Sequence, residues 1–118
     1  MFENRLQHLM ERINGALAIS LVYQDGIPVE SAGGSDGLDL EALAAEMMAT
    51  TRSIADDHRE LDVGEVRQFS VTTERYTILV SSLDKGYYLL LVLGDRGIYG
   101  KARFELRRAL LEFEQDLY

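Results

Sequence analysis

Hydrophobic residues along the chain change their spacing from one segment to the next, and each spacing predicts a type of element. Near the N-terminus they recur as on one face of a helix, at Phe2, Leu6, Leu9, Met10 and Ile13. An apolar stretch that begins at Gly15 then runs into Asp25-Gly26, a pair that favours a hairpin turn with positive φ at both residues. Pro28-Val29 begins the next strand, so the chain is predicted to open with a helix and a β-hairpin.

A second amphipathic helix is predicted to begin after Asp39, whose carboxylate can accept a hydrogen bond from a free amide of the first turn. Leu38 and Leu43 are spaced as a hydrophobic staple around this cap. The face expected to be buried comprises Leu40, Leu43, Ala44, Met47, Thr51 and Ile54. The opposite face carries a row of small residues, Ala42, Ala45, Ala49 and Ser53.

This alanine row has two interpretations. Small side chains allow a second helix to approach closely, whereas alanine also favours helix at exposed positions without touching anything. Met48 and Arg52 flank the row, and both residue types are enriched in protein interfaces. The row is therefore a candidate contact between the second helices of two chains in a symmetric dimer.

The polar segment from Asp56 to Asp62 is predicted to be a loop, followed by strands at about 63–71, 75–83 and 87–93 joined by short hairpin connections. The last strand is apolar on both faces, so it should lie centrally with helices on either side. The first of the three has the mixed composition of an edge strand. A closing helix at about 98–116 completes the order α-β-β-α-β-β-β-α, an α+β fold.

The composition of the chain narrows the range of functions that it can have. A chain of 118 residues fits a single domain, 1–118, and without cysteine it can form neither disulfides nor thiolate sites. No apolar run is long enough to span or insert into a membrane and the N-terminus is unlike a signal peptide, so a cytoplasmic protein is expected. The net charge of −8 opposes nucleic-acid binding, with Arg103, Arg107 and Arg108 as the one local basic stripe.

No catalytic or cofactor-binding constellation is present in the sequence. The loop Gly33-Gly34-Ser35-Asp36-Gly37 lacks the Gly-Lys-Ser/Thr ending of a phosphate-binding P-loop, and Gly94, Gly97 and Gly100 do not have dinucleotide-binding spacing. Asp56, Asp57 and His58 are adjacent in sequence and have no second cluster to complete a metal shell. We therefore expect no enzyme activity, no cofactor and no metal.

Beside the element order, the characteristic segments of the chain are Gly15-Ala16 with its apolar strand, Asp25-Gly26-Ile27-Pro28-Val29, the small-residue second helix, and Phe104-Glu105-Leu106-Arg107-Arg108-Ala109. In these features the chain resembles the Roadblock family, which includes dynein light chains and MglB-like bacterial partners of small Ras-like GTPases. The resemblance spans nearly the whole chain.

The resemblance implies a five-stranded antiparallel sheet with the second helix on one face and the first and third on the other. It also implies a homodimer that pairs edge strands and second helices and binds a small Ras-like GTPase, modulating its nucleotide cycle. Carried onto this chain, the dimer and partner interface comprises Ala42, Ala45, Met48, Ala49, Arg52, Arg67, Gln68, Phe69, Ser70 and Val71. The chain ends at the third helix, without the C-terminal extension of some GTPase activators of the family.

Two other functions remain open from the sequence. The chain could be a scaffold subunit that pairs with a different Roadblock-type chain in a larger assembly. It could also be a small-ligand sensor, since helix-covered antiparallel sheets host sensor pockets, and Tyr76, Tyr87 and Tyr88 are the candidates to line one.

Overall fold

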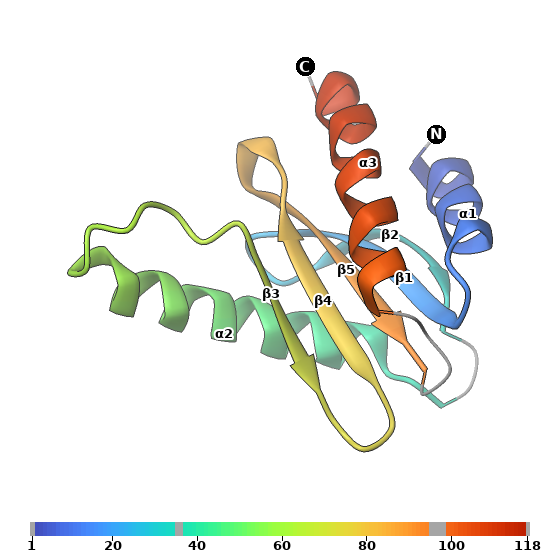
Figure 1. The fold of residues 1–118 in the computed structure, drawn as a ribbon, viewed down its shortest axis with the longest axis horizontal. Helices are drawn as coiled ribbons and strands as arrows, with labels where there is room; N and C mark the ends of the chain where they lie inside the picture. The colour runs from blue at the N-terminus through green and yellow to red at the C-terminus, as the bar shows by residue number, and fades with distance from the viewer. Residues whose placement is uncertain (1, 35–36, 95–98, 118) are drawn as a thin grey trace.

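The computed structural model, which describes residues 2–34, 37–94 and 99–117, forms one five-stranded antiparallel sheet covered by helices on both faces (Figure 1). The sheet order is β2-β1-β5-β4-β3, which places β2 and β3 at the two edges. The elements in chain order are α1 (Phe2–Arg12), β1 (Ala16–Tyr23), β2 (Pro28–Gly33), α2 (Leu40–Arg59), β3 (Gln68–Thr72), β4 (Thr77–Ser82), β5 (Tyr87–Leu93) and α3 (Tyr99–Leu117).

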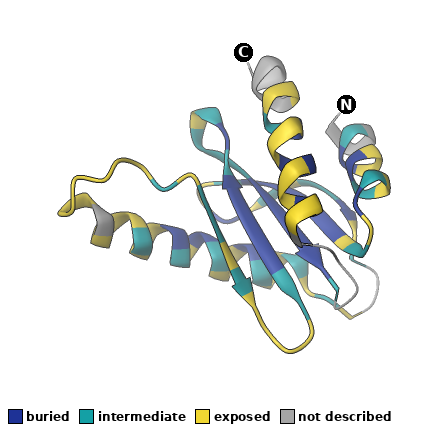
Figure 2. Ribbon diagram, in the orientation of Figure 1, coloured by how far each residue is buried: buried dark blue, intermediate teal, exposed yellow. Residues whose placement is uncertain are grey.

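The central position predicted for the last strand is confirmed. β5 lies between β1 and β4, and its residues from Leu89 to Leu93 are buried (Figure 2). Leu89, Leu91 and Leu93 pack with α1 and α3, while Leu90 packs with α2. Two hydrophobic layers on opposite faces therefore share one strand, which explains why its sequence lacks the alternation of a half-exposed strand.

The hairpin between β1 and β2 forms where expected, but its turn differs from the prediction. Gly26 has a φ of +88°, whereas Asp25 is not among the described residues with positive φ. The Gly26 N–H donates to the Tyr23 carbonyl at 2.9 Å, and the Asp25 carboxylate accepts from the Ile27 N–H at 2.9 Å. Only one residue needs left-handed backbone because this loop is longer than a two-residue turn.

Helix α2 begins as predicted and ends later than predicted. The Asp39 carboxylate caps it by accepting from the Ala42 N–H at 3.1 Å. The helix then continues to Arg59, so residues 56–59 are helical and the predicted loop is wrong there. This last turn extends beyond the sheet, and Asp56, Asp57 and Arg59 in it are exposed, which suits their polar character (Figure 1).

The strand predicted from residue 63 is shorter in the structure. Asp62 and Gly64 have positive φ, and residues 61–65 are exposed, so this stretch returns the chain from α2 to β3 without pairing. The closing helix agrees with its predicted range within one residue, although Ile98 lies outside the described residues, as do Ser35, Asp36 and Gly97. Among the described helices, none is long and apolar enough to cross a bilayer.

Candidate interaction surface

Strand β3 is an open sheet edge, as its mixed sequence indicated. Its register with β4 pairs Phe69 with Val80 and Ser70 with Leu79. Two hydrogen bonds just beyond the ends of β3 show which of its residues bond to β4. The Ser82 N–H donates to the Arg67 carbonyl and the Thr73 N–H donates to the Tyr76 carbonyl, both at 2.8 Å. Odd-numbered residues of β3 therefore bond β4.

The even-numbered residues of β3 direct their backbone groups the other way. The N–H and C=O groups of Gln68, Ser70 and Thr72 point away from β4, toward the outer edge of the sheet that the described strands form. The strand contains no proline, and its pairing with β4 has no bulge. It therefore presents an edge able to add another strand.

The alanine row of α2 is exposed and faces away from the sheet. All four residues of the row are exposed, namely Ala42, Ala45, Ala49 and Ser53. Ala44 on the opposite side of the helix is fully buried. Ala45 also has a role within the chain, because a Cβ at Gly26 would lie only 3.4 Å from its Cα. The small residue at position 45 thus lets the β1–β2 turn approach the helix.

One flank of α2 lies beside this turn. Arg52, a predicted interface residue, donates from Nη1 to the Gln24 carbonyl at 3.3 Å. This hydrogen bond joins α2 to the β1–β2 turn within the same chain. The structure corrects the prediction that Met48 lies in the interface. Its side chain is 2% exposed and packs in the core between α2 and the sheet. The sequence pattern does not assign its side because Met48 lies at the boundary of the face predicted to be buried, and the true buried face is rotated toward it.

The other flank of α2 carries residues that the sequence analysis left out of the interface. Leu43, Met47, Thr50 and Ile54 are half-buried and follow one another at helical spacing. Leu43 and Met47 pack at the margin of the same hydrophobic layer as Phe69. Phe69 lies on the edge strand, but its side chain is half-buried because it packs against this layer.

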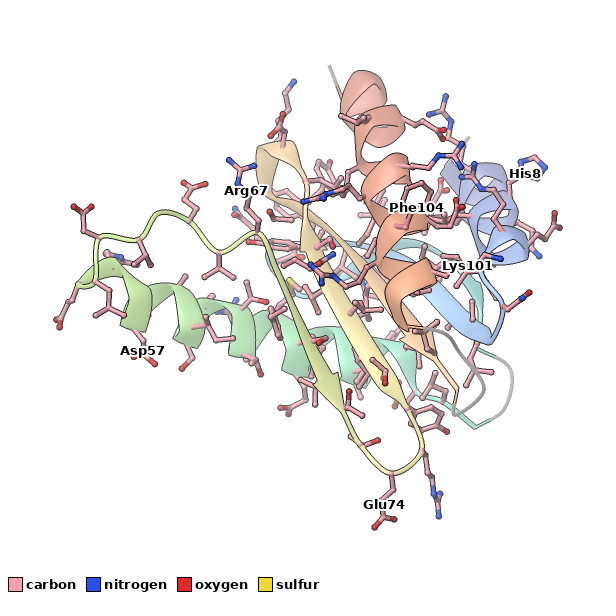
Figure 3. The ribbon with its side chains drawn as sticks, viewed as in Figure 1. His8, Asp57, Arg67, Glu74, Lys101 and Phe104 are labelled. Carbon is pink, nitrogen blue, oxygen red and sulfur yellow. The ribbon has the colours of Figure 1, made fainter. Side chains whose placement is uncertain are left out.

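The predicted residues at the start of β3 divide between the two faces of the sheet. Arg67 is exposed, and Figure 3 shows it at the start of β3. Gln68 turns to the α3 side, where its Oε1 accepts from Arg103 Nε at 3.1 Å. Val71 is half-buried and, like Phe69, lies on the α2 side by strand alternation.

The candidate ligand-sensing tyrosines do not meet in one cavity. Tyr87 packs against the layer under α1 and α3, with its ring edge-to-face against Tyr23 at 5.1 Å between centroids. Tyr76 and Tyr88 pack on the opposite face of the sheet, under α2. Within residues 2–34, 37–94 and 99–117, no three His, Asp or Glu side chains gather as metal ligands.

Comparison with known proteins agrees with this architecture. MglB from Myxococcus xanthus superimposes with a TM-score of 0.87 at 16% identity, over 98% of this chain and 93% of that one. A Roadblock/LC7 domain from Streptomyces avermitilis gives a TM-score of 0.87 at 19% identity, over 98% of this chain and 96% of that one. MglC from Myxococcus xanthus gives 0.72 at 28% identity, over 98% of each chain.

No curated protein matches this sequence. Residues 3–93, which run from the second residue of α1 to the end of β5, match the Roadblock/LC7 domain. The chain therefore belongs to the Roadblock/LC7 family.

Proposed function

We propose that the protein is a non-enzymatic homodimeric regulator that binds a small Ras-like GTPase and modulates its nucleotide cycle. The observation that carries the proposal is the position of β3 at an edge of the sheet, where the outward backbone groups of Gln68 and Thr72 fit a second copy of the same strand. Roadblock/LC7 family membership and the resemblance to MglB support the kind of partner.

Pairing two β3 edges antiparallel around a two-fold axis perpendicular to the sheet would make one continuous sheet. Both α2 helices then lie on the same face of that sheet. The half-buried flank with Leu43, Met47 and Thr50 faces the partner copy, while Phe69 is covered at the joint. This burial supplies the apolar component that strand pairing alone lacks.

The alanine rows take a different position in such a pair. Because Ala42, Ala45 and Ala49 point away from the sheet, they form the outer surface of the two adjacent helices. Small side chains there make a flat surface that another protein can approach closely. We assign this surface to the GTPase. If the alanine rows of the two copies touched each other instead, as the sequence analysis predicts, Ala49→Glu would also dissociate the dimer.

The proposal is tested with the purified chain and a Ras-like GTPase encoded beside it, loaded with GDP or with a non-hydrolysable GTP analogue. Light scattering after gel filtration should give a dimer alone and a larger complex with one nucleotide state. Ala49→Glu should weaken the complex at least tenfold while the dimer mass is unchanged. Gln7→Glu adds the same charge on the exposed face of α1 and should leave binding intact.

Failure of the wild-type protein to bind the GTPase in either state would overturn the GTPase assignment. A chain that is monomeric by itself but pairs with another Roadblock-type chain would instead favour the scaffold-subunit function. The protein alone is expected to turn over no GTP, and turnover that persists after repurification would contradict the non-enzymatic assignment.

A further inference from the structure

A groove of about 460 Å³ runs between α3 and the β3–β4 side of the sheet, on the face opposite α2. Helix α3 packs on the sheet through Ala102, Leu106 and Ala109, while Ser70 and Thr72 of β3 stay exposed. One side of α3 forms the wall of the groove with Gly100, Arg103, Phe104, Arg107 and Leu110. Figure 3 shows Phe104 on α3 and Arg67 across from it at the start of β3.

The floor of the groove is polar and ordered by hydrogen bonds that join three elements. Gln68 of β3 donates from Nε2 to the Ser81 hydroxyl of β4 at 2.7 Å, and its Oε1 accepts from Arg103 Nε of α3 at 3.1 Å. Ser81 is fully buried. The guanidinium of Arg103 is thus held at a fixed place against the sheet, which preorganises a positive charge for a ligand.

The groove has a charge opposite to that of the rest of the molecule. Its lining includes Arg67, Arg103 and Arg107 and no acidic side chain, in a chain whose net charge is −8. Arg108 belongs to a different cluster, because it lies 3.5 Å from the carboxylate of Glu105. Among the described residues, no carboxylate forms an ion pair with Arg67 or Arg107.

The groove also offers apolar surface beside these charges. Phe104 is 59% exposed and Leu110 is half-buried, and both stand on the α3 wall. A large exposed aromatic next to arginines is typical of protein-binding surfaces. A nucleic acid is a poorer fit, because its phosphates would extend past the groove onto a strongly acidic protein.

We propose that this groove binds an extended acidic segment of a partner protein, with carboxylates on Arg103 and Arg107 and apolar side chains against Phe104. The groove lies within one chain, so this binding does not require the dimer. It also uses neither the outer face of α2 nor the outward edge of β3. The groove therefore provides a second, independent docking site on the opposite face from the proposed GTPase surface.

The test uses fluorescence anisotropy with a labelled seven-residue peptide that alternates glutamate with leucine and phenylalanine. A matched peptide has glutamine in place of glutamate, and a ten-nucleotide oligothymidylate provides the nucleic-acid comparison. The double variant Arg103→Gln and Arg107→Gln removes two charges from the wall. Its control, Lys101→Gln and Arg75→Gln, removes two exposed charges that do not line the groove.

The wild-type chain should bind the glutamate peptide at micromolar concentrations and bind the glutamine peptide at least tenfold more weakly. The groove variant should lose at least tenfold in affinity for the glutamate peptide. The control variant should lose less than twofold, because neither of its two charges lines the groove and exposed charges that do not contact the ligand are weakened by salt. Light scattering should show the same oligomeric mass for both variants. A loss of peptide binding could then not be caused by a change in oligomeric state.

Several outcomes would overturn the proposal. These are equal binding of the two peptides, equal losses in the two double variants, tighter binding of oligothymidylate than of the glutamate peptide, and no peptide binding up to about 1 mM. The GTPase experiment can fail without affecting any of these measurements.

Discussion

Replacing Ser70 with proline tests the proposed edge pairing with little effect on the fold of the single chain. The Ser70 N–H points away from β4, so proline removes none of the hydrogen bonds between β3 and β4. Proline is tolerated on an edge strand at such a position, and we expect a loss of folding stability on the order of 1 kcal/mol. The main effect should fall on the dimer.

The size of that effect follows from the outward groups. Each β3 offers three outward N–H groups, at Gln68, Ser70 and Thr72, and proline removes one from each of two strands. A lost hydrogen bond that leaves its acceptor unpaired costs about 1–3 kcal/mol. Two such losses weaken the dimer by about 2–6 kcal/mol, or about 30-fold to 10⁴-fold in dissociation constant.

The assay is sedimentation velocity over a range of protein concentrations, with urea unfolding of the same samples. Ser70→Ala keeps the N–H and should remain dimeric. Val71→Pro removes a bond within the β3–β4 ladder and should unfold at lower urea than Ser70→Pro. A Ser70→Pro chain that stays dimeric at low micromolar concentration would refute the edge pairing. A monomeric Ser70→Pro chain that binds the GTPase with full affinity would instead refute the dependence of GTPase binding on the dimer.

Three further predictions concern folding stability, each measured by urea unfolding at fixed protein concentration. Gly33→Ala should cost at least about 2 kcal/mol because φ is +77° and a Cβ would overlap the Leu17 carbonyl oxygen, whereas Gly37→Ala has similar φ and open space and should cost less. Leu91→Ala leaves a cavity in the fully buried central strand and should cost about 2–5 kcal/mol, and a smaller loss would show that the core closes around it. Asp39→Ala removes the α2 cap and should cost about 1 kcal/mol, an effect that Asp39→Asn should largely avoid.

The periodicity of the sequence was sufficient to predict the elements whose burial is decided locally. The apolar strand Tyr87–Leu93 was placed centrally because only a strand covered on both faces can be apolar throughout. The cap at Asp39 was found because its chemistry is local. The end of α2 was missed because polar residues are compatible with both a loop and a helix that extends into solvent.

The candidate surface was only partly predictable for a different reason. A helical period shows which residues share a face, but it does not show which flank of the helix lies beside a given strand. The contact of Ala45 with Gly26 and the burial of Met48 settle that orientation, and both depend on how α2 crosses the sheet. The basic groove was inaccessible to sequence reasoning because Gln68, Ser81 and Arg103 come from three separate elements.

The two edges of the sheet are not equivalent, and this difference limits how large an assembly can grow. β2 begins at Pro28, which has no N–H, and its pairing with β1 is irregular next to that residue. A sheet with two regular edges could join further copies end to end and form fibres. Because only β3 is suited to pairing among the described strands, the proposed dimer would use the one available edge of both copies, and strand addition would stop at two.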